Sequence, residues 1–538
     1  MLNYFLLIFS VIIFVCILLN RFSRRFGVPV LLAFLLLGVV TGLGNDIHEE
    51  SWLVSDVCTA ALIFIMFYGG FGTSWKSARP VAVESGVLAT LGVFLTAALT
   101  GLFCFFVLKW QLAESLLMGA VVSSTDAASV FSILRSRKLG LKNHTAPILE
   151  MESGSNDPMS YMLTAVMISV VTGTASVGQV GWMVFAQLVF GAGSGLVIAT
   201  GVIWLRRHVS FANSGFDMLF ISAVAVISYA LPSLVGGNGY LSAYIVGIVL
   251  GNFDKTTQKY IVHFFDGVTT LMQIVIFFLL GYLTDLSSLE DSVLPALAIM
   301  AFMLIVARPV SVFSILFPFN RRKKPEEQYR MKQQLFISFV GLRGAASIVF
   351  AIMAVLGTQG LLQHDIFSVV FCLVILSISL QGSFIPWMAR KLDTVDTSDV
   401  MKTFTDFSDE EEMQFGQLKI GADNVWCGKA VRDLSLPQQM LLTLVLRGEE
   451  KIVPTGSTQL QAGDVVIICT LGYRDEQATC LREHPLADHS RWAGKPLKDY
   501  PHSDASLVVM IKRGDERLVP NGDTVIRQGD VLVILDRD

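Results

Sequence analysis

Charged residues are scarce in this chain of 538 residues and are unevenly distributed. They make up 16% of the chain, against roughly 25% in average soluble domains, while 53% of the residues are hydrophobic. From Met1 to about Trp387 the sequence consists of apolar runs separated by short polar loops, and from about Ala389 it has the composition of a soluble protein. This pattern predicts a membrane-embedded region followed by a soluble one. The net charge of −4 gives no reason to expect nucleic acid as a partner.

Several sequence motifs are missing as well. The seven cysteines form no Cys-x-x-Cys pair and no metal-binding spacing. No Walker motif is present, and no Gly-x-Gly-x-x-Gly follows a predicted strand, which argues against ATP-driven transport and against NAD binding in the usual way. The Thr-Val-Gly-Tyr-Gly filter of potassium channels is also absent.

Thirteen apolar runs are predicted to be transmembrane helices, each of which needs about 20 mostly apolar residues. The first run lacks the basic start and the cleavage site of a signal peptide, so we interpret it as a span. The expected spans are 2–20, 28–43, 52–71, 80–108, 112–134, 146–172, 180–205, 216–235, 238–252, 263–284, 292–317, 333–356 and 365–388.

The loops between these spans differ in charge on alternate sides. One set carries nearly all of the loop lysines and arginines, such as Arg24 and Arg322, whereas the other set carries only Lys109. Because basic loops stay in the cytoplasm, we expect the N-terminus outside and the C-terminus inside.

The soluble tail contains an internal repeat. Residues 426–469 and 492–535 align without a gap, with Trp-x-Gly-Lys near the start and Gly-Asp-Val near the end of each copy. Alternating β-branched runs separated by glycine turns predict a small α+β region that is rich in strands. We expect a transmembrane domain at 1–390, an acidic linker at 391–415, and two related modules at 416–485 and 486–538.

Acidic and hydroxyl groups gather in the span 112–134. Its segment Ser-Ser-Thr-Asp-Ala-Ala, which includes Thr125 and Asp126, would let a helix break and expose backbone carbonyls. Such oxygen atoms suit an alkali cation that has lost its water shell. The alternative is that Asp126 lies at the inner edge of the span and is solvated.

The span 146–172 carries three carboxylates within eight residues, ending at Asp157. An intramembrane carboxylate costs several kcal/mol and indicates function by default. Ser153 and Asp157 are four residues apart and share a helix face. In the alternative reading these acids lie in a loop and the helix begins only at Met159.

Two arginines also fall within predicted spans. Arg308 and Arg343 are always charged, so each needs a buried acid or a helix C-terminus as a partner. Glu152 and Asp157 are the obvious acids, and the glycines beside Arg343, including Gly344, indicate a second broken helix. If spans 1–6 and 8–13 form inverted repeats, the two broken helices occupy matching positions, as at the midplane site of a transporter.

Three motifs now occur in a characteristic order: Ser-Thr-Asp-Ala-Ala, Glu-Ser-Gly-x-Asn-Asp-Pro and Gly-Leu-Arg-Gly-Ala. Together they resemble the NhaP-type monovalent cation–proton antiporters over residues 1–390, and the tail resembles two copies of the C-terminal module of TrkA/RCK regulators. The combination looks most like the bacterial potassium/proton antiporters. It implies a polytopic α-helical protein of the inner membrane that exchanges K+, or also Na+, for H+ electroneutrally, in cation and pH homeostasis.

The resemblance also implies roles for single residues. Asp157 would hold either the cation or the proton, Asn156 would be its partner, and Ser153 a ligand. Thr125 would give a backbone oxygen, and Asp126 would act directly or through water. This sequence has Asp-Ala where many relatives have Asp-Pro at the first break.

Outside that set, the resemblance implies an ion pair between Glu152 and Arg308, while Arg343 and Gly344 lie at the second break. No resident cofactor is expected, although the modules could bind a nucleotide-like regulator. The expected partners are membrane lipid, monovalent cations, protons and a second copy of the chain.

Three alternatives stay open at this point. They are a Na+/H+ antiporter, a cation channel gated by the tail, and an intramembrane aspartyl protease that uses Asp126 and Asp157. The buried arginines and Asn156 speak against the protease, so we expect no enzyme.

Overall fold

The chain divides into two compact units, Met1–Ser408 and Asp409–Asp538, which are described separately. The computed structural model describes residues 10–11, 14–15, 30–42, 51–137, 139–142, 144–209, 214–253, 258–284, 288–321, 328–396, 413–422, 424–434, 436, 440–448, 450–471, 480–486, 492–500, 506–513, 516–518 and 520–536.

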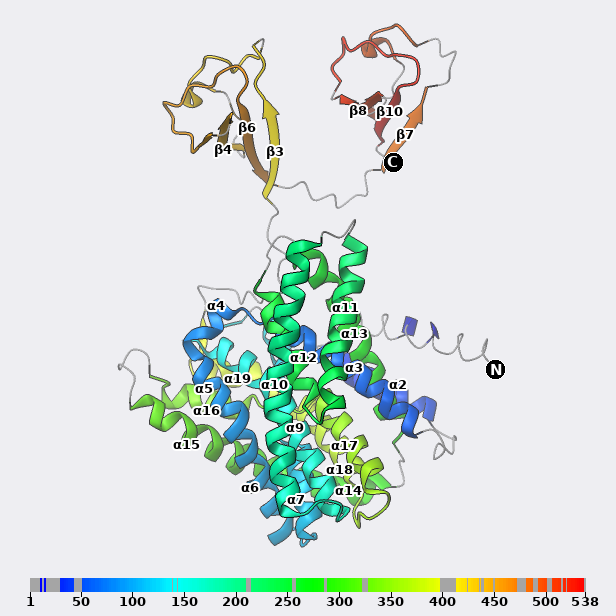
Figure 1. Cartoon of the computed structure of the whole chain (residues 1–538), viewed down its shortest axis with the longest axis vertical. Helices are drawn as coiled ribbons and strands as arrows, with labels where there is room; N and C mark the ends of the chain where they lie inside the picture. The colour runs from blue at the N-terminus through cyan, green and yellow to red at the C-terminus, as the bar shows by residue number, and fades with distance from the viewer. Residues whose placement is uncertain are drawn as a thin grey trace. The chain divides into compact units, whose positions relative to one another are not determined.

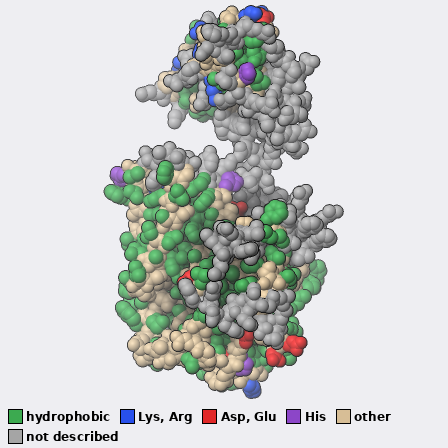
Figure 2. Space-filling model, turned by 90° about the vertical axis from the view of Figure 1, so that its right-hand side faces the viewer, with side chains coloured by type: hydrophobic (Ala, Val, Ile, Leu, Met, Phe, Trp, Pro, Cys, Tyr) green, Lys and Arg blue, Asp and Glu red, His purple; other side chains and the backbone are tan. Residues whose placement is uncertain are grey.

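The first unit is built of helices that pack side by side (Figure 1). Their bounds are α2 Val30–Gly42, α3 Ser51–Phe71, α4 Trp75–Ala78, α5 Ala82–Val87, α6 Val93–Phe106, α7 Leu112–Val121, α8 Ala127–Ser136, α9 Thr145–Val171, α10 Val177–His208, α11 Ser214–Leu234, α12 Gly239–Gly251, α13 Gln258–Tyr282, α14 Leu289–Phe302, α15 Arg308–Asn320, α16 Met331–Phe339, α17 Ala345–Thr358, α18 Ile366–Leu376 and α19 Gly382–Lys391. Among the described residues, seven helical stretches are long and apolar enough to cross a membrane, and four shorter helices are apolar as well. Figure 2 shows hydrophobic side chains spread over the visible face of this unit.

The predicted spans agree with these helices from 28–43 onward, since each overlaps a helical segment. The first predicted span, 2–20, lies almost entirely outside the described residues, so the count of thirteen stays a prediction. Three long helical stretches each contain one π-helical segment, a feature that is frequent at functional sites. These segments are η2 Leu88–Gly92, η4 Met303–Ala307 and η5 Ser377–Gln381.

Small residues bring several helix pairs into backbone contact. A Cβ atom added at Gly70 or Gly247 would collide with the facing backbone of α12 or α3, and one added at Gly281 would collide with α2. Membrane helices have little hydrophobic drive to associate, so close van der Waals packing through small residues contributes much of their cohesion.

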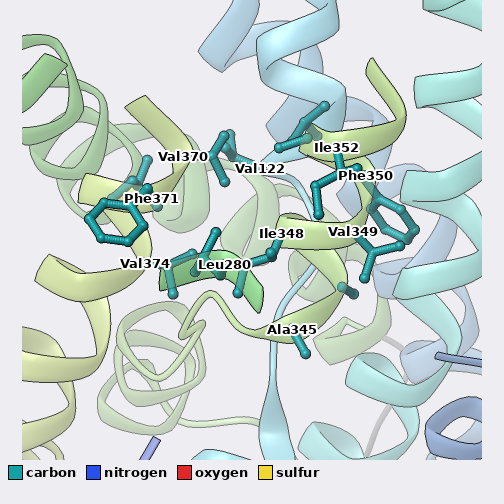
Figure 3. Packing of buried hydrophobic residues seen from close by; sticks show 14 of the residues in the cluster. Val122, Leu280, Ala345, Ile348, Val349, Phe350, Ile352, Val370, Phe371 and Val374 are labelled. Carbon is teal, nitrogen blue, oxygen red and sulfur yellow. The ribbon is translucent and has the colours of Figure 1, made fainter. Parts of the chain in front are cut away.

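The largest hydrophobic cluster surrounds the second broken helix. Figure 3 shows Ala345 and Ile348 of α17 near Leu280 of α13 and Val374 of α18, with Val122 of the first break close by. This apolar packing fixes the half-helices on either side of the breaks, and the polar site lies between them.

A short sheet closes the helical unit. Strand β1 Gly140–Leu141 precedes α9 and pairs antiparallel with strand β2 Val395–Asp396, which follows the last helix. Lys142 Nζ lies 2.9 Å from Asp393 Oδ1 beside this sheet. The segment in which the chain leaves the helical unit is therefore attached to the loop before α9.

The second unit contains two antiparallel sheets of four strands with the same order. The first has the order β3-β6-β4-β5 and the second β7-β10-β8-β9. Their bounds are β3 Met413–Lys419, β4 Met440–Arg447, β5 Glu450–Ile452, β6 Val465–Leu471, β7 Cys480–Pro485, β8 Ser506–Arg513, β9 Glu516–Leu518 and β10 Val531–Asp536, with one 3₁₀ helix in each copy, η7 Val431–Asp433 and η8 Leu497–Asp499. The repeat predicted from sequence is thus a repeat of structure.

The predicted boundaries of the modules are wrong at two places. Strand β7 pairs with β10 along its whole length, so 480–485 belongs to the second module and not to the first. Strand β3 begins at Met413, within the expected linker 391–415. Residues 397–412 of that linker lie outside the described part of the chain.

Candidate cation and proton site

The first break separates α7 from α8 and consists of residues 122–126. Ser124 and Thr125 are buried there, and hydroxyl side chains of this kind compete with the helical backbone for hydrogen bonds. Asp126 caps the helix that follows, because its carboxylate accepts from Ser129 N at 3.1 Å and from Ser129 Oγ at 2.5 Å. The predicted break is therefore present, and Asp126 is half-buried at the end of the break that adjoins α8.

The second break separates α16 from α17 and consists of residues 340–344. It lies against the first break, because Asp126 N donates to Leu342 O at 2.8 Å. Arg343 Nη1 donates to Ser124 O at 2.5 Å and to Ser123 O at 3.2 Å. These carbonyls follow directly on the C-terminal end of α7, where a helix has negative partial charge. Arg343 was expected to be paired with a buried acid or with a helix C-terminus, and in the structure it is bound to the helix C-terminus.

Helix α9 carries the acidic residues and faces the first break. It runs without interruption for 27 residues across Pro158, so the alternative of a loop before Met159 is wrong. Ser153 Oγ donates to Thr125 O at 2.7 Å and accepts from Ala127 N at 2.8 Å. A single hydroxyl therefore bridges both sides of the break.

Asp157 and Asn156 lie one turn farther along α9. Asp157 is only 7% exposed, and its Oδ1 accepts a hydrogen bond from Ser124 Oγ. Asn156 Nδ2 donates to Thr125 Oγ1 at 2.5 Å. Within the described part of the chain, Asn156 Oδ1 is buried with no hydrogen-bond partner. The site thus combines a buried carboxylate with an unused amide oxygen, and both are hard ligands that suit an alkali cation.

Glu152 and Arg308 form a buried ion pair beside this group. Arg308 Nη1 donates to Glu152 Oε1 at 2.9 Å, and the two side chains are 4% and 2% exposed. Arg308 directly follows the π segment η4, and such segments are frequent at functional sites. Glu152 Oε2 also lies 3.5 Å from Thr125 Oγ1, so the pair contacts the first break.

All the residues expected at the site are therefore brought together around the two breaks. Gly344 lies at the crossing itself, where an added Cβ would stand 2.6 Å from Asp126 Cβ. The sequence assigned no role to Ser124, which lies within the first motif and binds Asp157. It also assigned none to Ser377, whose Oγ accepts from Arg343 N at 3.1 Å. Glu84, a buried acid on α5, was also passed over, although a carboxylate within an apolar span is itself a signal of function. Helix α5 packs against α9.

Comparison with known proteins identifies the family. Residues 10–391 match the family described as "Sodium/hydrogen exchanger, transmembrane". The chain belongs to the sodium/hydrogen exchanger family. In this exchanger, residues 416–471 and 481–535 match the TrkA-C domain, so the two sheets of the second unit are TrkA-C modules.

Curated relatives resemble the exchanger over both units. It is 32% identical over 489 residues to "K(+)/H(+) antiporter NhaP" of Alkalimonas amylolytica, which covers 89% of this chain and 83% of the relative. It is also 32% identical to "K(+)/H(+) antiporter NhaP2" of Shewanella baltica, over 87% of this chain and 81% of that one. A more distant relative is "Na(+)/H(+) antiporter ApNhaP" of Aphanothece halophytica, at 23% identity over 75% of this chain and 77% of that one.

Among solved structures, the sodium proton antiporter MjNhaP1 of Methanocaldococcus jannaschii has a similar fold. The TM-score is 0.61 at 24% identity, covering 71% of this exchanger and 97% of that chain. The expected fold class is confirmed: a polytopic helical membrane protein with two interrupted helices and a small C-terminal region of TrkA-C modules.

Proposed function

We propose that the exchanger moves a monovalent cation, K+ and also Na+, across the membrane in exchange for H+, by secondary active antiport. Relatives that share 32% identity over most of the chain carry the name K(+)/H(+) antiporter. The observation that carries the proposal is the buried Asp157, bound by Ser124 of the first break and adjacent to the free oxygen of Asn156.

Asp157 holds either a proton or a dehydrated cation, and never both. When loaded with either one, the carboxylate is neutralised and can pass the low-dielectric barrier. When empty it is ionised, and burial of an unpaired charge costs several kcal/mol. This asymmetry couples the two fluxes without ATP.

The surrounding charges support an electroneutral exchange. Arg308 is paired with Glu152, and Arg343 is bound to the carbonyls at the end of α7. Asp157 is then the group whose charge changes during the cycle. One cation therefore replaces one proton, and the site carries the same charge in both loaded states.

Ser153, Thr125 and Asp126 complete the proposed ligand set. Thr125 O and Ser153 Oγ lie 2.7 Å apart at the first break, whose Ser124 also binds Asp157. A cation that enters would replace the hydrogen bond between them with two coordination bonds, while Asp126 would act through water from the inner end of the break.

We further infer the setting of the exchanger in the cell. The basic loops support an N-terminus outside the cell and a C-terminus on the cytoplasmic side of the inner membrane. The exchanger works as a homodimer, and the TrkA-C modules regulate it by binding a small ligand, such as a nucleotide-like regulator, on the cytoplasmic side.

The proposal is tested with purified protein in vesicles, where proton movement is the readout. Raising the cation concentration should shift the apparent pKa of transport downward, because cation and proton compete for one carboxylate. Substituting K+, Na+ and Li+ in turn gives the cation preference. Cation flux without proton counterflow would indicate the tail-gated channel instead.

Asp157→Asn should abolish exchange while the protein stays folded, because an amide of the same shape cannot trade a proton. Asp266→Asn is the matched control, since Asp266 is an exposed acid on α13 far along the chain from the breaks, and it should retain exchange. An active Asp157→Asn variant, or an apparent pKa that ignores the cation concentration, would overturn the mechanism.

A further inference from the structure

A second group of titratable and aromatic side chains lies away from the breaks. Glu114, in the first turn of α7, is 3% exposed. Its Oε1 accepts from His364 N at 2.7 Å, and its Oε2 lies 3.1 Å from His364 Nδ1. The buried Trp110 stacks on the His364 ring, with centroids 4.5 Å apart and planes inclined by 17°. We call Trp110, Glu114 and His364 the outer cluster.

The outer cluster joins the far ends of the two half-helices that meet at the site. Helix α7 begins beside Glu114 and ends at the first break, and α17 begins at the second break and ends six residues before His364. The two half-helices are in contact with each other. A change in the outer cluster therefore acts on one end of α7 and of α17. The other ends of these two helices adjoin the breaks, where Arg343 contacts Ser124.

The elements around His364 contribute few charged residues to its surroundings. Helices α17 and α18 carry no charged residue, and the turn after α6 contributes Lys109. Asp365 is used as the cap of α18, since it accepts from Ser368 N at 3.0 Å. Helix α14, which packs on α18, contributes Glu290 and Asp291 in its first turn. Glu114 is thus the carboxylate in direct contact with the ring.

We propose that the outer cluster is a regulatory proton-binding site, distinct from the transport site, which senses the pH on the side opposite the basic loops. This inference rests on the proposed antiport function and adds its regulation. The His364 side chain is 38% exposed, so its ring can exchange protons with water, whereas the Glu114 side chain is buried. Histidine is the side chain best placed to change charge near neutral pH.

Protonation strengthens the cluster in two ways. The hydrogen bond with Glu114 becomes an ion pair in which both groups are charged, and the cationic ring lies against the indole of Trp110. At low pH the start of α7 is therefore held firmly to the turn between α17 and α18, and at high pH this hold weakens. The proton occupancy of the cluster thereby biases the spacing of the half-helices and the rate of exchange.

The test measures exchange in vesicles with the protein in one orientation, at a cation concentration that saturates the transport site. Saturation suppresses competition at Asp157, so any remaining effect of pH on the outer-cluster side reports another proton site. The wild-type rate should change by roughly fivefold across the titration of histidine, a typical size for allosteric coupling. His364→Gln, which keeps a donor for Glu114 but cannot titrate, should remove this change and retain exchange.

Two further variants sharpen the result. Glu114→Gln should shift the midpoint of the pH effect to lower pH, because the protonated ring loses its anionic partner. His208→Gln is the matched control: the His208 ring also packs against a tryptophan, Trp204, with centroids 4.8 Å apart, but its Nδ1 faces the Trp204 carbonyl oxygen at 2.7 Å. That variant should keep the wild-type pH effect.

The inference is wrong if folded, active His364→Gln protein keeps the wild-type pH effect, or if the wild type shows none at saturating cation. Failure of the proposed function would look different, because the wild type would then exchange no protons for cations at any pH.

Discussion

At the scale of single residues, three charges buried beside the breaks are each held by a different kind of partner. Arg308 is bound by the carboxylate of Glu152, Arg343 by helix-end carbonyls, and Asp157 by a serine hydroxyl. A hydroxyl can donate to the carboxylate but does not neutralise it. This leaves Asp157 as the group that can gain and lose a proton or a cation.

The ion pair between Arg308 and Glu152 leads to the first stability prediction. Arg308→Ala leaves a buried carboxylate without its counter-charge, which costs about 3–5 kcal/mol. We expect less folded protein and a lower melting temperature, measured by thermal unfolding of the purified protein. Glu152→Gln combined with Arg308→Gln should be less damaging, because no buried charge is left alone. A double variant as unstable as Arg308→Ala would show that the pair does not stabilise α9 against α15.

The residue types of the site could be predicted from sequence, but not all of their contacts. Asp157, Asn156 and Ser153 stand out because polar groups within an apolar span are costly and therefore informative. Ser124 lies in the first motif, but its role could not be predicted, because its bond to Asp157 depends on how α9 packs against the break. Charged groups in an apolar span are therefore easier to recognise from sequence than the hydroxyl groups that bind them.

At the scale of elements, the breaks were predictable but their crossing was not. Glycine, serine and threonine at 122–126 and 340–344 indicate where the helices stop. The contact of Arg343 with Ser124 joins residues 219 positions apart, which no local pattern encodes. Strand β7 was assigned to the wrong module for a related reason: Cys-Leu-Arg-Glu-His-Pro has little alternation, and only its pairing with β10 defines it.

Gly344 gives the prediction for the crossing of the breaks. An alanine there would place its Cβ 2.6 Å from Asp126 Cβ, so the two breaks must separate. We expect exchange to fall about tenfold or more, equivalent to a loss of at least ~1.4 kcal/mol, because the contacts that position Ser124 depend on this approach. Gly193→Ala is the control, since an added Cβ there meets open space on α10. If Gly344→Ala transports like Gly193→Ala, the close approach has no role in transport.

The TrkA-C modules contain a repeated ion pair whose pH dependence can be predicted. Arg447 donates two hydrogen bonds of 2.8 Å to Asp464, and Arg513 and Asp530 form the same arrangement in the second module. The hydrogen bonds from Arg447 hold the pKa of Asp464 below its ordinary value. A carboxyl group whose pKa is lowered by folding stabilises the fold above its unfolded pKa, and this stabilisation is lost as the pH falls through the folded pKa.

Arg447→Ala should therefore lower the melting temperature of the second unit at neutral pH. The difference from the wild type should shrink as the pH falls from the ordinary aspartate pKa toward the lower pKa of Asp464 in the folded wild type, below which Asp464 is protonated in both proteins. Differential scanning calorimetry over a pH series measures this. A difference that stays constant down to that range would mean that Arg447 acts through packing and not through its charge.

At the scale of the whole molecule, one short sheet joins the segment where the chain leaves the helical unit to the loop before α9. Strand β2 lies within the expected linker 391–415 and is the last described part of the helical unit, and it pairs with β1, which precedes α9. Thr145, the first residue of α9, donates through Oγ1 to Lys142 O at 2.6 Å and accepts from Gln333 of α16 at 3.0 Å. The start of the site helix, the helix before the second break and the exit of the chain are therefore linked by hydrogen bonds.

This connection predicts that two truncations close together in sequence differ in effect. Deletion from Asp399 onward keeps β2 paired with β1 and keeps Asp393 beside Lys142, so exchange should persist while its activation changes. Deletion from Thr394 onward also removes β2, and the loop before α9 loses its attachment. This shorter chain still contains Asp393, so the loss comes from the backbone hydrogen bonds of the sheet and not from the exposed ion pair with Lys142. We expect a lower rate and a lower melting temperature for the shorter chain, measured in the same vesicles and by thermal unfolding. A folded protein truncated at Asp399 that exchanges nothing would show that the modules are required for transport itself, and equal behaviour of both truncations would show that β2 transmits nothing to the site.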